Sequence, residues 1–453
     1  MKKKKVLIVG AGYGGLFTLK QCLAEGLDAT ILEANAYIGG VWEPRSGALL
    51  PTTECVSSKH YMGASDFPMD ASYPEFPMHQ DVLRYIHSVQ SIVHDAYAPT
   101  NTWKLDVQEA GMQETLESDF VVLCTGLDTP NTPSEWSHLQ QCQDKLSEHS
   151  LKGRMSLGVL PLHASQYVHV RQERNITEAL QDNPDLKILI VGCSDSACDI
   201  ANDLFYRKGA RNMTMTGHQG AWFQDKAVGF QKPSDMFFSF FCNWVKNWLG
   251  WKLFEQCVVW PMLTCWMEHF WGKNGIGVKE WQPRTVVRNE PTYMSTAYVK
   301  SRSIIGLLNN GSVKPVQQAI PNLNGTVTVT LLHNTANDQQ RESQSETAHF
   351  DLVIVCSGYK FRPGATVGLQ NHATLLDPSN LYKMTFSIPL PTLAVVGNIR
   401  PHVTSIVTMS EFQAWRVAHS FAHLNKKNDN GERHILSPEN QALRQEMTAR
   451  DRD

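Results

Sequence analysis

Two glycine-containing turns constrain the fold of this chain more than any other feature of its sequence. The first turn, GAGYGG, spans residues 10–15, and the second, GCSDSA, spans residues 192–197. Each follows a short apolar run and opens a stretch with the composition of a helix. Glycines allow the backbone to approach a pyrophosphate closely, and the N-terminus of the helix stabilises its negative charge. The chain is therefore predicted to bind two dinucleotides.

The first turn lies within a complete set of the elements that a dinucleotide site needs. Residues 6–9 predict a buried parallel strand, and residues 16–26 predict the helix that follows the turn. A second strand is predicted over residues 29–32, and it ends at Glu33, where an acid accepts hydrogen bonds from ribose hydroxyls. We therefore interpret this turn as a dinucleotide site rather than an ordinary loop.

The second turn follows a good strand at residues 187–191, but a serine and an alanine replace its second and third glycines. Small side chains still permit close approach, so a second dinucleotide is predicted here. An ordinary strand, turn and helix without a ligand is the alternative. Cys193 and Cys198 have the spacing of a redox pair. Because they lie inside the nucleotide turn, we interpret them as packing residues.

Composition narrows the classes of function. With 453 residues the chain is long enough for two domains, and its net charge of −3 at pH 7 offers no basic field to a nucleic acid. The ten cysteines are scattered without the pairs that hold a metal, and no metal site is expected. No convincing secretory signal is visible, so a reducing, cytoplasmic environment is expected.

The middle of the chain is rich in aromatic residues, with eight of the twelve tryptophans between Trp222 and Trp281. Residues 236–271 carry too many charges for a membrane span, because each charge costs about 2.5 to 3.5 kcal/mol at the bilayer centre. Two interpretations stay open. One is a mainly helical insertion packed on the body of the protein or on a second copy in a homodimer, and the other is a peripheral membrane anchor.

Two further segments, DFVVLCTG at residues 119–126 and DLVIVCSG at residues 351–358, are near copies of each other. Such strands return the chain to a dinucleotide domain. The predicted fold class is α/β, with two Rossmann-like dinucleotide-binding domains and an aromatic-rich helical insertion at about residues 228–300. A flavin domain over residues 1–165 and 331–453 is interrupted by a nicotinamide domain over residues 166–330.

Short motifs also occur in a fixed order along almost the whole chain. They are GGVW at 39–42, SDFP at 65–68, CTG at 124–126, GAW at 220–222, KPSD at 232–235, SGY at 357–359, NLYK at 380–383 and EFQA at 411–414. Together with the two turns, these motifs resemble those of the flavin-containing monooxygenases, the class B flavoproteins that oxygenate nitrogen and sulfur.

The resemblance implies a monooxygenase that uses FAD and consumes NADPH, with NADH as the alternative reductant. In this reading the reduced nicotinamide passes hydride to FAD, and the reduced flavin takes up O2 as a C4a-hydroperoxide. A small soft nucleophile, such as an amine or a thioether, then attacks the distal oxygen. Baeyer–Villiger oxygenation of ketones and an uncoupled NAD(P)H oxidase are the alternatives.

Because the flavin carries the chemistry, most of the implied site residues are binding residues. Those implied at FAD are Gly10, Gly12, Gly14, Gly15, Glu33, Val41, Trp42, Thr125 and Gly126. Those implied at the nicotinamide cofactor are Gly192, Ser194, Asp195, Ser196, Ala197, His218 and Lys226. Alignment alone assigns Val56, Ser57 and Ser58 to the catalytic cleft between the cofactors, and Trp42 is equally well explained as a core aromatic.

One departure from the family's pattern lies near this cleft. The family places an asparagine beside the flavin and the nicotinamide, shortly before a Ser-Lys pair, and Val56 occupies that position here. A lost hydrogen bond is typically worth about 1 kcal/mol. Thr53, Ser57 and Ser58 are the candidate substitutes.

Two other departures concern the second dinucleotide. The family carries an arginine for the 2′-phosphate of NADPH before the GAW motif, whereas this chain has His218 and Gln219, with Lys226 as the candidate compensation. In the signature between the two domains, Ser156 replaces an aromatic residue, and the interval that leads to His163 is one residue too long.

Overall fold

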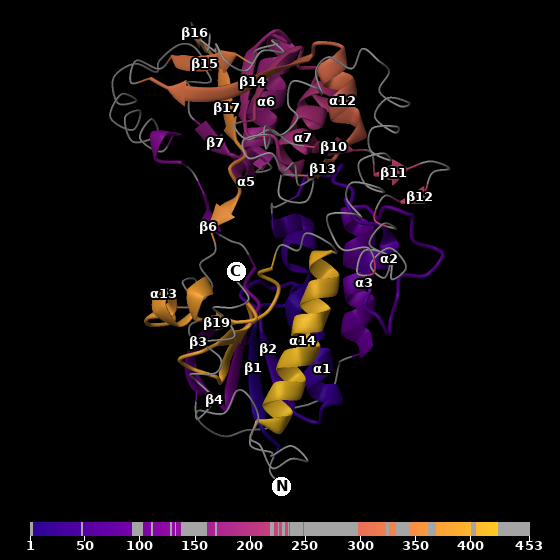
Figure 1. Ribbon diagram of the computed structural model, residues 1–453, viewed down its shortest axis with the longest axis vertical. Coiled ribbons are helices and arrows are strands. Elements are labelled where there is room, and N and C mark those ends of the chain that lie inside the picture. Colours follow the sequence, from indigo (N-terminus) through magenta and orange to yellow (C-terminus); the bar gives the residue numbers. More distant parts are fainter. Residues whose placement is uncertain are drawn as a thin grey trace. The chain divides into compact units, whose positions relative to one another are not determined.

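The computed structural model describes residues 3–46, 49–92, 103–109, 112–126, 129–131, 133–136, 161–167, 170–217, 222–224, 226–228, 232–233, 235, 248, 298–322, 326–331, 345–360, 368–399 and 405–424. The chain forms two compact units. Residues 1–129 and 359–453 make the first, and residues 130–358 make the second (Figure 1). The interrupted order expected from the sequence, in which the chain leaves one unit and later returns to it, is confirmed.

A six-stranded sheet forms the centre of the first unit, in the order β19-β20-β21-β5-β1-β2. Its strands are β1 (Lys5–Val9), β2 (Asp28–Leu32), β5 (Phe120–Leu123), β19 (Leu381–Tyr382), β20 (Phe386–Ser387) and β21 (Leu393–Val395). Strands β2, β1, β5 and β21 are parallel. Val9 lies opposite both Leu32 and Leu123, and Leu123 lies opposite Val395, so the four strands end at one edge. Ligands of open parallel sheets bind at this carboxyl edge.

Helices cover the first sheet. Helix α1 (Tyr13–Ala24) packs against α14 (Ile406–His423), and Figure 1 shows the two beside the strands. Phe120 of β5 and Phe421 of α14 stack in the shared core with ring centroids 4.1 Å apart. The other elements are η1 (Gly40–Trp42), η2 (Pro44–Ser46), α2 (Lys59–Met62), α3 (His79–Ile92), α13 (His372–Leu375), η8 (Pro378–Asn380) and the antiparallel pair β3 (Trp103–Glu109) and β4 (Met112–Ser118).

A seven-stranded sheet forms the centre of the second unit, in the order β16-β15-β14-β9-β8-β17-β7. Its strands are β7 (Pro161–His163), β8 (Lys187–Val191), β9 (Asn212–Thr216), β14 (Val313–Pro321), β15 (Val327–Leu331), β16 (Ser345–Ala348) and β17 (Leu352–Val355). The strands from β14 to β7 are parallel, and β15 and β16 are antiparallel. Two parallel-strand cores with covering helices confirm the predicted α/β class.

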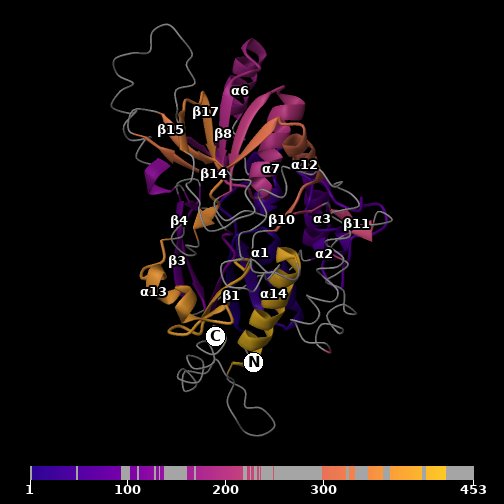
Figure 2. The same ribbon diagram turned by 45° about the horizontal axis from the view of Figure 1, so that its top comes forward.

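Helices and short strand pairs complete the second unit. The helices are α5 (Ala164–Tyr167), α6 (Val170–Asp182), α7 (Asp195–Asn202), the π-helical turn η3 (Asp203–Arg207) and α12 (Arg302–Asn309). Helix α7 packs against β8 and α12 (Figure 2). The short pairs are β10 (Trp222–Gln224) with β13 (Tyr298–Lys300), and β11 (Ala227–Val228) with β12 (Lys232–Pro233). Strands β6 (Thr129–Pro130) and β18 (Tyr359–Lys360), which lie where the chain passes from one unit to the other, also pair.

The two near-copied segments become corresponding strands of the two sheets. Strand β5 lies beside β1 in the first sheet, and β17 lies beside β8 in the second. The segment at 351–358 therefore belongs to the second unit, and the unit boundaries at 129/130 and 358/359 differ from the expected ones at 165/166 and 330/331. The reason is that β16 and β17 pair with the strands of the second sheet, which local sequence patterns do not reveal.

Of the predicted aromatic insertion at about residues 228–300, the structure describes only residues 228, 232–233, 235, 248 and 298–300, and the side chain of Trp248 is exposed. The rest of the insertion lies outside the described residues. Among the residues that the structure describes, no helix combines the length and the apolar character that a membrane crossing requires.

Candidate functional site

The first glycine turn is held against the carboxyl ends of two strands. Gly10 has φ +104°, and a Cβ atom there would lie 2.5 Å from the carbonyl oxygen of Cys124, directly after β5. A Cβ on Gly15 would lie 1.9 Å from the carbonyl oxygen of Gly10. A Cβ on Gly14 would lie 3.3 Å from the carbonyl oxygen of Val396, directly after β21. Glycine is therefore required at the first and last positions, and the turn and the strand ends share one edge.

The second glycine of the turn faces a more open space. Gly12 is the N-cap of α1 without a side-chain cap, and a Cβ placed on it would lie 3.7 Å from the Cα of Gly40. The amide of Gly39 donates to the carbonyl oxygen of Ala11 at 3.0 Å and holds the next loop against the turn. Because no side chain caps α1, its first amide groups are available to a phosphate. The residues of this turn therefore fit the pyrophosphate of a dinucleotide.

Glu33 directly follows β2 and connects this strand to the turn. One carboxylate oxygen accepts a hydrogen bond from the amide of Ala11 at 2.7 Å. The other accepts from the backbone amide and the side-chain amide of Asn35, both at 2.9 Å. An acid in this place lies beside the ribose of a dinucleotide whose pyrophosphate occupies the turn.

Val41 and Trp42 follow the same turn on η1. The side chain of Val41 is about half exposed, whereas Trp42 is partly buried and packs against the core of the first unit. A core contact is thus present for Trp42, and contacts of both residues with FAD stay predictions.

Two polar side chains lie at the carboxyl edge beside the turn. Thr125 follows β5 closely, and Asn398 follows β21 closely. The Thr125 hydroxyl and the side-chain amide nitrogen and oxygen of Asn398 are buried, and they have no hydrogen-bond partner among the residues that the structure describes. The neighbouring Gly126 has φ +72°. Thr125 and Gly126 are residues that the sequence predicts at FAD, whereas Asn398 belongs to none of the recognised motifs.

The loop that carries Val56, Ser57 and Ser58 is held by the segment before α3. The amides of residues 55 and 59 donate to the carbonyl oxygens of residues 77 and 75, each at 2.8 Å. Val56 is 37% exposed, whereas Ser58 is fully buried and is the N-cap of α2. Tyr13, inside the first turn, donates to the carbonyl oxygen of Met62 at 2.8 Å and ties α2 to the turn.

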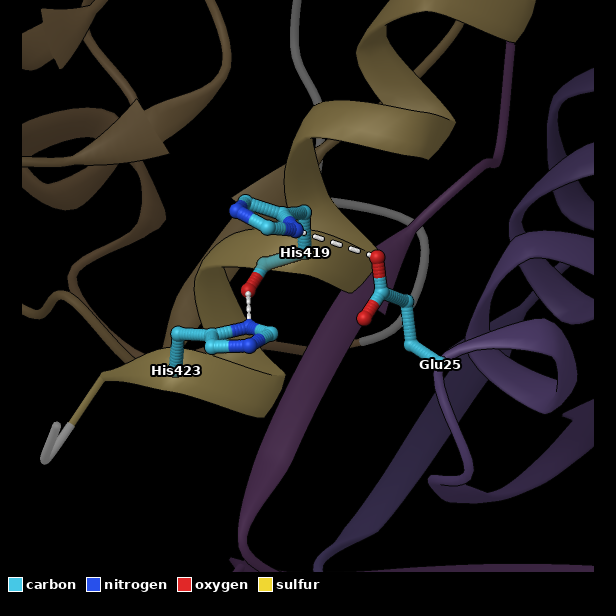
Figure 3. Close-up of side chains that lie close together, drawn as sticks. All are labelled: Glu25, His419 and His423. Atoms are coloured by element: carbon cyan, nitrogen blue, oxygen red, sulfur yellow. Dashed lines mark hydrogen bonds and ion pairs between the residues drawn. The ribbon is translucent and has the colours of Figure 1, made fainter.

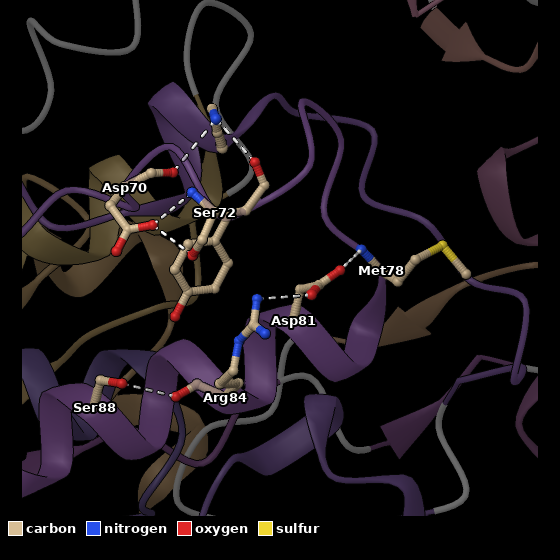
Figure 4. Close-up of polar contacts among 8 residues, drawn as sticks. Asp70, Ser72, Met78, Asp81, Arg84 and Ser88 are labelled. Atoms are coloured by element: carbon tan, nitrogen blue, oxygen red, sulfur yellow. Dashed lines mark hydrogen bonds and ion pairs between the residues drawn. The ribbon is translucent and has the colours of Figure 1, made fainter.

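Side-chain hydrogen bonds order the segment that holds this loop (Figure 4). Asp81 accepts from the amide of Met78 at 3.1 Å and from the guanidinium of Arg84, also at 3.1 Å, so it caps the start of α3. Asp70 accepts from the hydroxyl and the amide of Ser72 at 2.6 and 2.7 Å. These two bonds lower the pKa of Asp70 below its ordinary value.

The second glycine turn repeats the geometry of the first at its opening residue. Gly192 has φ +114°, and a Cβ there would lie 2.6 Å from the carbonyl oxygen of Cys356, directly after β17. The amide of Gly192 donates to the hydroxyl of Thr216 at 2.9 Å. The backbone of the turn is therefore fixed by the strands on both sides of β8.

The rest of the second turn opens α7. Ser194 is the N-cap without a side-chain cap, so the first amides of the helix are available to a phosphate, as in the first turn. Asp195 and Ser196 are the first two residues of α7, and Ala197 is completely buried. The structure thus places the four predicted residues in one helix start.

The two units differ at the end of the second strand. Strand pairing places Gly217 beside the second turn, where the first unit has Glu33 beside the first turn. No carboxylate therefore stands at this position of the second unit. Lys226 lies between β10 and β11 and is partly buried, and His218 lies outside the described residues.

Cys193 and Cys198 are free thiols in the second turn and in α7. Burial raises the pKa of Cys193 to about 11 and raises the pKa of Cys198 well above its ordinary value. Thiolate is the reactive form in disulfide exchange, so the burial of both thiols favours the packing interpretation.

His163 ends β7 and is buried in the second unit. One ring nitrogen lies 2.9 Å from the hydroxyl of Ser165, and the other lies 3.0 Å from the carbonyl oxygen of Gly358. Burial lowers the pKa of His163, and the hydrogen bond to the carbonyl of Gly358 partly opposes this effect. These contacts describe a packed histidine that fixes the chain after β17.

A group of metal-type ligands lies elsewhere in the first unit (Figure 3). Nδ1 of His419 lies 3.1 Å from the carboxylate of Glu25, and Nδ1 of His423 lies 2.9 Å from the carbonyl oxygen of His419. One ligand atom from each residue lies within 4.8 Å of the others, a set that Zn²⁺ accepts. The group lies at the C-terminal end of α1, about 18 Å from the glycine turn by helix rise. Sequence analysis missed it because Glu25 and His419 are 394 residues apart.

Comparisons with known proteins place this geometry in a family. A family model described as flavin-binding monooxygenase-like matches residues 3–313. Flavin-containing monooxygenase 1 from Canis lupus familiaris is 26% identical over 449 residues, covering 91% of this chain and 73% of that protein. An N-oxide-forming dimethylaniline monooxygenase 2 from Rattus norvegicus is 26% identical over 440 residues, covering 91% of this chain and 72% of that protein.

A solved structure shares the fold. An oxidised steroid monooxygenase bound to NADP has a TM-score of 0.55 at 14% identity, over 98% of this chain and 90% of that one. Since the family model covers more than half of the sequence, this chain belongs to the flavin-binding monooxygenase-like family, whose members are oxidoreductases that use FAD and NADPH.

Proposed function

We propose that this protein transfers one oxygen atom of O2 to a soft nucleophile, an amine nitrogen or a thioether sulfur, at the expense of NADPH. Membership of the flavin-binding monooxygenase-like family supports the reaction class. The name of the rat relative, which forms an N-oxide from dimethylaniline, supports an amine as substrate. When bound, FAD accepts hydride from NADPH and activates O2, so the oxygen chemistry belongs to the cofactor. The residues of the chain bind and orient the cofactors.

The observation that carries this proposal is the glycine turn at the carboxyl edge of the first sheet. Gly12 leaves space above the open N-terminus of α1, and Glu33 stands where the adenosine ribose of FAD is held. The first unit is therefore the flavin domain. The hydroxyl of Thr125 lies at the same edge, and it is buried without a hydrogen-bond partner among the described residues. It can therefore donate to and accept from the same ligand.

The second unit is the nicotinamide domain in this proposal. Its turn keeps Gly192 and an open helix start at Ser194, and both favour a pyrophosphate. At the place of Glu33 it has Gly217, so no carboxylate repels a 2′-phosphate on the ribose. This difference supports NADPH over NADH. Contacts of the phosphate with His218 and Lys226 are part of the proposal.

The loop of Val56, Ser57 and Ser58 borders the reacting ends of the cofactors in this proposal. The side chain of Val56 has no hydrogen-bonding group, and the hydroxyl of Ser58 is buried. Thr53 already accepts a hydrogen bond from the amide of Leu50 at 3.1 Å. Ser57, which is only partly buried, is therefore the best placed of the three hydroxyls to hold a cofactor group in place of the family's asparagine.

The test begins with the purified, FAD-loaded protein under nitrogen, mixed with NADPH or NADH in a stopped-flow instrument. Bleaching of the flavin absorbance by NADPH, at least 10-fold faster at equal concentration than by NADH, is expected. Air-saturated buffer with dimethylaniline or a thioether is then added, and product and hydrogen peroxide are measured. One oxygenated product per NADPH supports the proposal. No reaction of any amine or thioether, with ketones oxygenated instead, would move the substrate class to ketones.

A second candidate function is an uncoupled NADPH oxidase, and Val56 is the observation that favours it. A valine in the cleft provides no hydrogen bond to retain a cofactor group during the oxygen reaction. The same experiment separates the two functions, because an oxidase returns one hydrogen peroxide per NADPH whether or not a nucleophile is present. Val56→Asn is the matched variant, and it should shift the yield from peroxide to product.

A further inference from the structure

The side-chain amide of Asn398 is buried and forms no hydrogen bond with the described residues. It follows β21 by three residues, and both its amide nitrogen and its amide oxygen are buried. Neither atom has a hydrogen-bond partner within the described part of the chain. Buried amides in folded proteins are almost always paired, because an unpaired one is costly. The amide of Asn398 is therefore placed to pair with a ligand.

The backbone beside Asn398 is held firmly. Gln413 of α14 is buried, and its side-chain oxygen accepts a hydrogen bond from the amide of Gly397 at 3.0 Å. The nitrogen of the same side chain donates to the hydroxyl of Thr385 at 3.0 Å and to the carbonyl oxygen of Met384 at 3.2 Å. Gln413 thus uses both of its polar atoms within the protein. The backbone directly before Asn398 is therefore fixed by α14.

Strand register places Asn398 close to the glycine turn. Strands β1, β5 and β21 are neighbours and end level with one another at Val9, Leu123 and Val395. A Cβ on Gly14 would contact the carbonyl of Val396, so the turn touches the chain just before Asn398. Thr125, whose buried hydroxyl also lacks a partner among the described residues, follows β5, the strand between β1 and β21.

The order of the strands gives a bound FAD its direction. With its pyrophosphate at the turn after β1, a bound FAD would have its adenosine ribose beside Glu33, which directly follows β2 and accepts a hydrogen bond from the amide of Ala11 in the turn. Because the sheet runs in the order β2-β1-β5-β21, the riboflavin half would then extend the other way, over the ends of β5 and β21. Asn398 stands at the end of that path.

We propose that the side-chain amide of Asn398 hydrogen-bonds the riboflavin half of the bound FAD. This inference rests on the proposed function, namely on the binding of FAD by the first unit. An amide supplies two donors and an acceptor from one side chain, which matches the mixed carbonyl, imide and hydroxyl groups of riboflavin. The role is to bind and position the flavin, and the adenosine half is unaffected.

The experiment measures FAD affinity of the apoprotein by quenching of flavin fluorescence. Asn398→Leu keeps the volume and removes the amide, and it should weaken FAD binding by about 10-fold, which corresponds to about 1.4 kcal/mol. The affinity for ADP, measured by competition, should stay within 2-fold of the wild type, because ADP lacks the riboflavin half. The matched control is Asn380→Leu, which removes an amide bonded to Thr374 at the amino end of β19 and should leave both affinities unchanged.

A second variant keeps the test valid if Asn398→Leu does not fold. Asn398→Asp has the same shape, and its negative charge beside the flavin should lower the reduction potential of the bound cofactor. Unchanged FAD affinity, absorbance spectrum and potential in these variants would overturn the inference while leaving the proposed function intact. Equal weakening of FAD and ADP would overturn it too, because the effect would then be structural. Failure of the wild-type protein to bind FAD would instead refute the proposed function.

Discussion

The two dinucleotide units share the backbone contacts between their central strands and glycine turns, and they differ in the residues at the later positions of the turns. In the first unit the amide of Cys124 donates to the carbonyl of Val9 at 2.8 Å, and in the second the amide of Cys356 donates to that of Val191 at the same distance. The first glycine of each turn then presses against the carbonyl of that cysteine. The close packing of the turn against the neighbouring strand therefore requires the opening glycine, whatever ligand is bound.

The two units differ at the last residue of the turn and at the residue that follows the second strand. Gly15 has no space for a Cβ, which would meet the carbonyl of Gly10 at 1.9 Å, whereas the corresponding Ala197 is accommodated and fully buried. Glu33 at the end of β2 has Gly217 as its counterpart after β9. The last residue of each turn thus depends on how closely the helix approaches the turn, and the acid after the second strand depends on which ribose is bound.

The largest effect is expected from exchanging the last residue of each turn. Gly15→Ala should cost about 3 kcal/mol of stability in the first unit, because the added methyl group meets backbone that cannot move aside. It should also abolish FAD binding, which is measured as flavin content after purification. The reverse change, Ala197→Gly, should cost only about 1 kcal/mol through helix propensity. A Gly15→Ala protein with full flavin content would show that the two turns do not differ in this way.

The next largest effect is expected at Gly217, the counterpart of Glu33, and it tests the preference for NADPH over NADH. Gly217→Asp places a carboxylate beside the 2′-phosphate of NADPH, so the KM for NADPH should rise about 10-fold to 100-fold, or about 1.4 to 2.7 kcal/mol. The KM for NADH should stay the same or fall, since its ribose hydroxyls can bond the acid. Gly217→Ala, which adds volume without charge, is the control. Equal rises with both reductants would contradict the proposed position of the adenosine ribose.

Much of this comparison was predictable from local sequence. The apolar runs before both turns became β1 and β8, because a buried parallel strand reads as a continuous hydrophobic segment. The unit boundaries were not predictable in the same way. Residues 351–358 look like a returning strand of either sheet, and only their pairing with β8 assigns them to the second unit.

The site was predictable only where a motif marks it. Thr125 lies in a recognised CTG motif, whereas Asn398 is a single polar residue after a three-residue strand and carries no pattern. Its burial beside the glycine turn depends on the pairing of segments more than 250 residues apart. The placement of Val56 at the cofactors came from alignment and stays a prediction.

A smaller effect is expected at the carboxylates that open the returning strands. Asp119 accepts a hydrogen bond from the amide of Lys5 at 2.8 Å, and Asp351 accepts one from the amide of Lys187 at 2.8 Å. Asp119→Ala should cost about 1 to 2 kcal/mol in urea unfolding, because this bond is partly buried. Asp351→Ala should cost less than about 1 kcal/mol, because its bond is exposed to water. Asp119→Asn keeps an acceptor and should restore most of the loss, and equal costs in both units would contradict the difference in burial.

The smallest effect is a shared sensitivity to acid, carried by one buried histidine in each unit. Burial lowers the pKa of His79 in the first unit and of His163 in the second below the ordinary value of 6.5. The unfolded chain takes up a proton near pH 6.5, whereas the folded chain does so only at lower pH. The contribution of the two neutral histidines to the unfolding free energy is therefore fully present above pH 6.5, and it is lost as the pH falls toward their pKa values in the folded chain.

Urea unfolding between pH 7.5 and 5 checks this expectation. His79→Gln and His163→Gln should each flatten the fall in unfolding free energy, even if each lowers its value at pH 7.5. His163 has a carbonyl partner that partly opposes the lowering of its pKa, whereas Nδ1 of His79 is buried without a hydrogen-bond partner among the described residues. The exposed His419 offers the control, because His419→Gln should change the slope least. An unchanged slope in both buried-histidine variants would assign the acid sensitivity to carboxylates and remove this likeness between the two units.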